Sequence, residues 1–165
     1  MSASVECREA SRHDLPAVLE LYAQPDLDDG EVLALADAER LFERIARYPD
    51  YRIYVAVAGD EIVGTFALLV MDNLGHLGAR SAIIEDVAVA PEWQGRGIGR
   101  QMMRHALRLC EQKGCYKAAL SSNLKRARAH AFYESLGFER HGYSFRTALP
   151  QHELTGPSPQ EGADT

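Results

Sequence analysis

Apolar positions recur along the chain with two different periods, and these periods predict its secondary structure. Apolar residues three or four positions apart, the spacing of one helix face, mark the segments 12–24, 32–47, 98–113 and 126–136. Shorter runs rich in β-branched and aromatic residues predict strands at 5–9, 51–57, 61–71, 83–90, 116–121 and 138–149. The predicted order is therefore βααβββαβαβ.

Residues at the segment ends support the boundaries of the first two helices. Ser11 stands where a helix cap is expected, and Asp14 falls in the first turn. Pro25 and Pro49 should stop the two helices, because proline lacks an amide donor. The inward faces are predicted to be Leu15, Val18, Leu19 and Tyr22 in the first helix, and Leu33, Ala36, Leu41, Ile45 and Tyr48 in the second.

The connections between strands predict the fold class. Ala58-Gly59-Asp60 reads as a hairpin turn, so the strands that it joins should pair antiparallel. The segment 72–80 is either another hairpin connection or a loop on the substrate side. The helix at 98–113 is a crossover, whose flanking strands should be parallel. We expect an α/β or α+β arrangement of helices around one mixed sheet.

Size and composition limit the possible classes of function. The 165 residues, 46% of them apolar, fit one domain at 1–149 and a polar, disordered tail at 150–165. The net charge of -6 argues against a protein that grips nucleic acid or an anionic membrane. Cys7, Cys110 and Cys115 suggest neither a disulfide framework nor a metal site, and the histidines lack ligand spacing. No export signal or membrane-spanning run is recognisable, so we expect a soluble, cytoplasmic protein without a metal.

The stretch Gln94-Gly95-Arg96-Gly97-Ile98-Gly99 carries the first chemical signal. It joins the predicted strand 83–90 to the predicted helix 98–113. Glycine lets the backbone approach an anion closely, and the first amide groups of a helix have no partner within it. The positive end of the helix dipole adds to this attraction. These residues predict a phosphate or pyrophosphate site, whose spacing fits neither a Rossmann fingerprint nor a P-loop.

A resemblance to a known family indicates which anion this site would bind. The segment from Ile84-Glu85-Asp86-Val87 through Gly99 resembles the acetyl-CoA-binding signature of the GNAT N-acetyltransferase superfamily, Gln/Arg-x-x-Gly-x-Gly/Ala, which Gln94, Gly97 and Gly99 fill. Downstream, Ala131-Phe132-Tyr133-Glu134-Ser135-Leu136-Gly137-Phe138 is similar to the family's Phe-Tyr-x-x-x-Gly-Phe block. Either motif alone is weak, but both occur in order and on the expected elements.

Two further stretches resemble subgroups of this superfamily. Gly114-Cys115-Tyr116-Lys117 is similar to glucosamine 6-phosphate N-acetyltransferases. Ser121-Ser122-Asn123-Leu124-Lys125-Arg126, with Ala129-His130 and Phe132-Tyr133 after it, is closer to aminoalkylphosphonate N-acetyltransferases. Both subgroups acetylate small amines, and the two hints disagree on the substrate.

The resemblance implies a mostly antiparallel central sheet flanked by helices, with acetyl-CoA as co-substrate. The glycine turn would hold the pyrophosphate, and backbone groups of the preceding strand would bond the pantetheine arm. The family often has an asparagine where this chain has Arg126, so Asn123, three residues earlier, is the nearest substitute. The implied cofactor-binding residues are Val87, Ala88, Val89, Gln94, Gly95, Arg96, Gly97, Ile98, Gly99, Arg100, Asn123 and Arg126.

Acetyl transfer needs a base for the amine and an acid for the departing thiolate. Glu85 is the first candidate for the base and Asp86 the second, because neighbouring residues of a regular strand face opposite ways. A bulge, which the family commonly has here, would change that. Tyr133 matches the family's general acid. The competing interpretations are a carboxylate paired with an arginine and a half-buried structural tyrosine.

We therefore expect direct acetyl transfer from acetyl-CoA to the primary amine of a small molecule, without a covalent acyl-enzyme. One alternative is a protein or peptide N-acetyltransferase, which would need a long open groove. Another is a non-catalytic acyl-CoA-binding sensor, which would tolerate replacement of Glu85 and Tyr133. Dimers are frequent in the family, so a homodimer is possible. The identity of the acceptor amine lies beyond the sequence.

Overall fold

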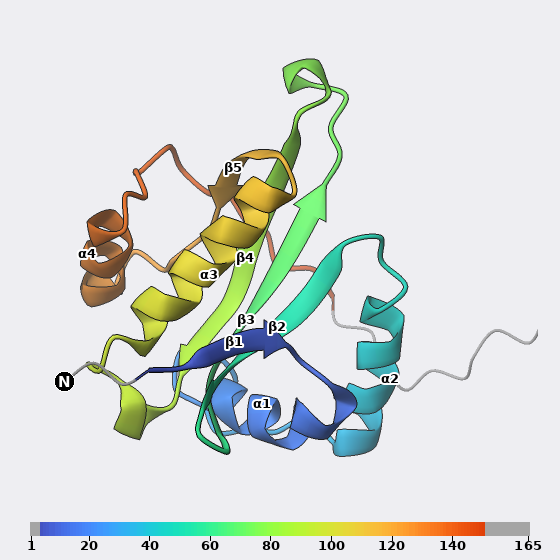
Figure 1. Ribbon diagram of the computed structural model, residues 1–165, viewed down its shortest axis with the longest axis vertical. Coiled ribbons are helices and arrows are strands. Elements are labelled where there is room, and N and C mark those ends of the chain that lie inside the picture. Colours follow the sequence, from blue (N-terminus) through green and yellow to red (C-terminus); the bar gives the residue numbers. More distant parts are fainter. Residues whose placement is uncertain (1–3, 151–165) are drawn as a thin grey trace, which may run out of the picture.

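The computed structural model describes residues 4–150, which form one five-stranded sheet with helices packed on both faces (Figure 1). The strands are β1 (Glu6–Glu9), β2 (Tyr51–Ala58), β3 (Glu61–Met71), β4 (Arg80–Val89) and β5 (Cys115–Ala119), and the helices are α1 (Leu15–Tyr22), α2 (Leu35–Ile45), α3 (Ile98–Gln112) and α4 (Ala127–Ser135). The strands lie in chain order across the sheet; β1 to β4 pair antiparallel, and β4 pairs parallel with β5. The expected mixed, mostly antiparallel sheet is confirmed.

Helix α1 begins as its capping residues predict. A single 3₁₀ turn, Arg12–Asp14, runs directly into the helix, and the Ser11 amide donates to the Asp14 carboxylate at 2.6 Å. Arg8 of β1 donates two further hydrogen bonds to this carboxylate, at 2.7 and 3.0 Å. These contacts lower the pKa of Asp14 to about 2. The first strand and the first helix are thereby joined by one nearly buried carboxylate.

Helix α2 differs from its prediction in both its start and its buried face. Ala34 is extended, with φ -57° and ψ 135°, so the helix begins at Leu35 and not at 32. Ala38 is buried, and Phe42 packs against the sheet, as does Ile45, which was predicted to face inward. Ala36 and Tyr48, both predicted to face inward, are exposed.

The two faces of the sheet bury separate clusters of side chains. Phe66 and Ile84 lie on the face covered by α3, where they pack against Met102. Val55 lies on the other face and packs with Val18 of α1. Figure 1 shows this layering, with α1 and α2 on one side of the sheet and α3 on the other. Each face of β4 therefore looks into a different environment.

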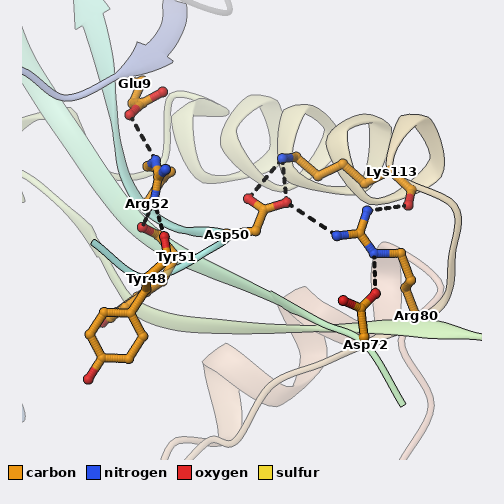
Figure 2. Close-up of polar contacts among 8 residues, drawn as sticks. All are labelled: Glu9, Tyr48, Asp50, Tyr51, Arg52, Asp72, Arg80 and Lys113. Carbon is orange, nitrogen blue, oxygen red and sulfur yellow. Dashed lines mark hydrogen bonds and ion pairs between the residues drawn. The ribbon is translucent and has the colours of Figure 1, made fainter. Parts of the chain in front are cut away.

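A network of ion pairs fixes the C-terminal end of α3 against the strands (Figure 2). Lys113, just after the helix, donates to both carboxylate oxygens of Asp50, at 2.7 and 2.8 Å. Arg80 at the start of β4 lies 3.9 Å from Asp50 and 3.1 Å from Asp72, and it donates to the Lys113 carbonyl at 3.1 Å. Gly114 then turns the chain with φ 73°, which is accessible to glycine without strain. The predicted end of this helix is confirmed.

The connections from β2 to β3 and from β3 to β4 are both hairpins. The predicted turn at Ala58-Gly59-Asp60 joins β2 to β3. The segment 72–80 joins β3 to β4, which pair up to Met71 and Ser81. This second connection lies at the opposite end of β4 from the glycine turn.

The final strand predicted at 138–149 is wrong. Residues 139–150 have no regular secondary structure, and Tyr143, Phe145 and Leu149 are 89%, 92% and 74% exposed. A period-two pattern forms a strand only where a neighbouring strand supplies backbone hydrogen-bond partners and packing buries one of its faces. Within the described part of the chain, β5 remains an edge strand. The tail predicted beyond Pro150 lies outside the described residues. Among residues 4–150, no helix is long and apolar enough to span a membrane.

Candidate active site

Strand β4 bulges at the predicted catalytic carboxylates. Ala67 pairs with Glu85 and Thr65 pairs with Ala88, so a single residue of β3 stands opposite two residues of β4. Asp86, within this bulge, has a φ of 52°, which is uncommon for a residue other than glycine. Cross-strand partners share a face of the sheet, so the extra residue brings Glu85 and Ala88 to the same side.

The side that Glu85 faces is the one covered by α1 and α2. Its partner Ala67 packs in the cluster with Val18, and Ala88 packs against Leu21 of α1. Burial raises the pKa of the Tyr22 phenol on α1, and the Asp86 carboxylate raises it further. Asp86 also lies within electrostatic range of a second phenol, that of Tyr51. Two carboxylates and two phenols therefore share this side of β4.

Both candidate bases are better proton acceptors than ordinary carboxylates. Partial burial raises the pKa of Glu85, and the charge of Asp86 adds to this effect. Partial burial also raises the pKa of Asp86, with a contribution from Asp28 in the connection after α1. A base is most effective when its pKa approaches the working pH, so both shifts favour proton abstraction near neutrality.

The second half of β4 has an open edge. The pairing of β4 with β5 ends at Ile83 and Ala119, whereas β4 continues to Val89. The Ala90 amide donates to the Val63 carbonyl at 2.8 Å, so by the antiparallel alternation the groups of Val89 point away from β3. The Val89 carbonyl instead accepts the side-chain amides of Gln24 and Gln94, each at 3.1 Å.

The glycine turn prepares the start of α3 to meet an anion. Gly95 and Gly97 have φ of 73° and 81°, values that only glycine adopts readily. The first turn of α3 contains no acidic residue, so nothing in it competes for the amide groups at the helix start. Trp93 steadies the turn: its indole N–H donates to Glu61 at 3.2 Å, and the Arg96 guanidinium lies 5.0 Å from its ring centroid.

The next two predicted cofactor residues contact α4. A Cβ added to Gly99 would lie 3.2 Å from the ring carbon Cζ of Phe132, so the absence of a side chain lets α4 approach α3. Arg100 donates to the Ser135 hydroxyl at 2.9 Å. These residues therefore position the helix that carries Tyr133.

Tyr133 is half-buried on α4. Its ring contacts those of Phe132 and Phe138, with centroids 5.2 and 5.8 Å apart. Burial raises the pKa of the phenol, and Arg126 partly offsets this, so the group stays protonated at neutral pH. Tyr133 packs with the cluster on the α3 side, whereas Glu85 faces α1 and α2. The structure thus places the two on different sides of β4.

The segment before α4 is held by hydrogen bonds to Asn123. The Asn123 side-chain oxygen accepts the Lys125 amide at 2.9 Å, and its carbonyl accepts the Arg126 amide at 3.0 Å. The ring nitrogen Nε2 of His130 lies 2.8 Å from the same carbonyl. This contact gives the His130 ring a partner. Within residues 4–150, no group of side chains forms a metal site.

Sequence reasoning missed Gln24 and Tyr51. Gln24 follows α1 and reaches the Val89 carbonyl 65 positions away, and it also accepts from the Gln94 side chain at 3.4 Å. Tyr51 begins a strand and had been counted only as a strand former. No local motif marks either residue, because both acquire their roles from the packing of distant segments.

Comparison with known proteins finds a matching family and named relatives. Residues 15–138 match the family described as Acetyltransferase (GNAT) family. The chain is 30% identical over 149 residues to the glucosamine 6-phosphate N-acetyltransferase of Trypanosoma brucei brucei, covering 88% of this chain and 96% of that protein. It is 28% identical over 144 residues to the aminoalkylphosphonate N-acetyltransferase of Salmonella typhimurium, covering 87% and 91%. The two subgroups that the sequence resembles are therefore both among its relatives.

The fold also matches solved structures. A Bacillus halodurans C-125 protein, described as a transcriptional regulator, superposes with a TM-score of 0.82 at 28% identity. The match covers 88% of this chain and 100% of that one. The sheet and its helices are therefore those of a known architecture.

Proposed function

Because the chain belongs to the GNAT acetyltransferase family, we propose that it transfers an acetyl group directly from acetyl-CoA to the primary amine of a small molecule. The observation that carries this proposal is the open edge of β4 beside the glycine turn. An extended pantetheine arm would lie along that edge, and its pyrophosphate would meet the start of α3. Both relatives described above are named for the acetylation of small amines.

The donor would be held mainly by backbone groups. Those of Val87, Ala88 and Val89 would bond the pantetheine amides, and the amides of the glycine turn would bond the pyrophosphate. Binding at Val89 requires its carbonyl to exchange a glutamine side-chain amide for an amide of the donor. The remaining donor contacts would come from Gln94, Gly95, Arg96, Gly97, Ile98, Gly99, Arg100, Asn123 and Arg126.

The proposed catalytic roles follow from the positions of Glu85 and Tyr133 on the two sides of β4. Glu85, directly or through a water molecule, would remove the proton from the acceptor amine, with Asp86 as the alternative base. The amine nitrogen attacks the thioester carbon, the C–S bond breaks, and Tyr133 gives its proton to the departing sulfur. A base and an acid on different sides of the open edge suit a reacting carbon that lies between them. A backbone amide near Val87 would polarise the carbonyl.

Replacement of one tyrosine tests the proposal. Tyr133→Phe should lower kcat by about tenfold or more and leave the acetyl-CoA Kd within about twofold, because only the leaving-group proton is lost. Tyr143→Phe is the matched control, since Tyr143 is 89% exposed. Thiol release with a panel of amines measures kcat, and calorimetry measures the Kd. Unchanged kcat contradicts the general acid, and donor binding without turnover on any amine favours a sensor.

A further inference from the structure

We propose that the Gln24 side chain occupies part of the donor site in the free protein, and that the pantetheine arm of acetyl-CoA displaces it from the Val89 carbonyl. Gln24 thereby lowers the affinity of the protein for acetyl-CoA and for the product CoA. This inference rests on the proposed function, because it concerns the edge of β4 along which the pantetheine arm would lie.

The Val89 carbonyl already accepts as many hydrogen bonds as it can. A carbonyl oxygen has two lone pairs. At Val89 the side-chain amide of Gln24 uses one and that of Gln94 uses the other, each at 3.1 Å. This carbonyl lies on the open edge of β4, beyond the last pair with β5 at Ile83. An amide of the donor can bond to it only after one of the two glutamines has left.

Gln24 is the glutamine that can leave without disturbing the anion site. Its side-chain nitrogen also donates to the Leu21 carbonyl at 3.0 Å, so it keeps one partner at the end of α1 after release. Its contact with Val89 joins segments 65 positions apart and belongs to no turn. Gln94 instead lies five positions after Val89 and ends the 3₁₀ turn Pro91–Trp93. The contact of Gln94 is therefore part of the turn that leads to the glycines.

The hydrogen bond that must be broken sets the direction and the size of the effect. If the Gln24 amide is removed, water takes its place, and the donor then displaces water and not a fixed side chain. One net hydrogen bond within a protein corresponds to about two- to tenfold in an equilibrium constant. Loss of the Gln24 amide should therefore strengthen donor binding, whereas loss of an ordinary contact with the donor would weaken it.

The sign of the change in affinity tests the inference. Gln24→Ala should lower the Kd of CoA, measured by calorimetry, about two- to tenfold. Gln112→Ala is the matched control, because Gln112 is an exposed glutamine at the last position of α3, and its Kd should equal that of the wild type. A Kd that is unchanged or higher in Gln24→Ala overturns the inference, since this is the result expected if Gln24 only caps α1.

NMR of the wild-type protein tests the displacement without relying on the folding of a variant. The Gln24 side-chain amide protons should exchange faster with water when CoA is bound, because one of their two acceptors has been lost. A ligand that merely covered this side chain would slow the exchange. Unchanged or slower exchange of the Gln24 amide at saturating CoA therefore overturns the inference.

Turnover separates this inference from the proposed function. Gln24→Ala should lower the KM for acetyl-CoA and the inhibition constant of CoA by similar factors, because both molecules carry the same pantetheine arm. Tighter CoA binding by Gln24→Ala without turnover on any amine would support the displacement and count against the enzyme alone. Normal turnover with unchanged CoA affinity overturns the displacement and leaves the proposed function intact. Absence of CoA binding to the wild-type protein overturns both.

Discussion

The contact between Gly99 and Phe132 yields a prediction about the role of Gly99. It tests whether Gly99 acts by positioning α4, the helix that carries Tyr133, or by binding the anion. In Gly99→Ala the new Cβ would lie 3.2 Å from Cζ of Phe132 and 3.8 Å from each of two neighbouring ring carbons. Carbon atoms in ordinary contact are about 3.5 to 4.0 Å apart. The ring must therefore retreat by up to about half an ångström, and we expect α4, which carries it, to shift with it.

The free energy of unfolding should change little in this variant. Crowding of a packed contact costs about 1 kcal/mol when the neighbour can give way. Alanine within a helix is favoured over glycine by about 1 kcal/mol. The two effects oppose each other, so the melting temperature should stay within about 4 °C of the wild-type value.

Turnover should respond much more strongly than stability. Misplacement of a catalytic group by about 1 Å can cost about a hundredfold in rate, so half that displacement of Tyr133 predicts a fall in kcat of about tenfold. The backbone amide of residue 99 is retained, and the acetyl-CoA Kd should rise by less than about threefold. Thiol release gives kcat, and calorimetry gives the Kd.

A second substitution provides the control. Phe132→Leu removes the ring atoms that the new methyl group meets, so the double variant with Gly99→Ala should recover part of the lost kcat relative to Phe132→Leu alone. A large rise in Kd with normal kcat would refute the reasoning, because it would place the role of Gly99 at the anion and not at α4.

Two further predictions concern the turn and the first helix. Gly97 has φ 81°, a conformation that is strained for a β-branched residue, so Gly97→Val should abolish acetyl-CoA binding while the circular dichroism spectrum keeps its helical signal; calorimetric binding of wild-type strength would contradict the anion site. The pKa of Asp14 is about 2 in the folded protein, against about 3.9 in an unfolded chain. This difference corresponds to at most about 2.6 kcal/mol above pH 4, and solvent screening of the partly exposed Arg8 partner reduces it to about 1 to 2 kcal/mol. That contribution is lost as the pH falls through 2. The difference in urea-unfolding free energy between wild type and Asp14→Asn should therefore shrink on acidification from pH 7 to pH 2, and a constant difference argues against this linkage.

Features that depend only on neighbouring residues could be predicted from the sequence. Ser11 and Asp14 mark a helix start, Ala58-Gly59-Asp60 marks a hairpin, and the glycines before α3 mark a left-handed turn, because each depends on a few neighbouring dihedral angles. The matched residues 15–138 confirm the family that the glycine turn and the later Phe-Tyr block indicated.

Features that depend on packing were not predictable in the same way. The buried face of α2 was only partly predicted: Ile45 packs on the sheet as expected, but Ala38 and Phe42 were not among the predicted residues, because docking against the sheet selects that face. The strand predicted around Tyr143 and Phe145 finds no neighbour within the described residues. The side of the sheet that Glu85 faces depends on pairing with β3, and the contact of Gln24 with Val89 joins segments far apart in the chain. The catalytic roles assigned to Glu85 and Tyr133 remain predictions.

The bulge at Asp86 determines which side chains of β4 share a face of the sheet. Before it, Glu85 lies on the face covered by α1 and α2. After it, Ala88 and Ala90 lie on that face, and the intervening Val87 and Val89 look toward α3. Ala88 and Ala90 are buried against Leu21 of α1, so a larger side chain at either position would press on that helix. Deleting one residue at the bulge would instead exchange the two faces for the rest of the strand. A change in the length of β4 at the bulge would therefore move every later side chain of the strand, whereas a substitution would alter one contact.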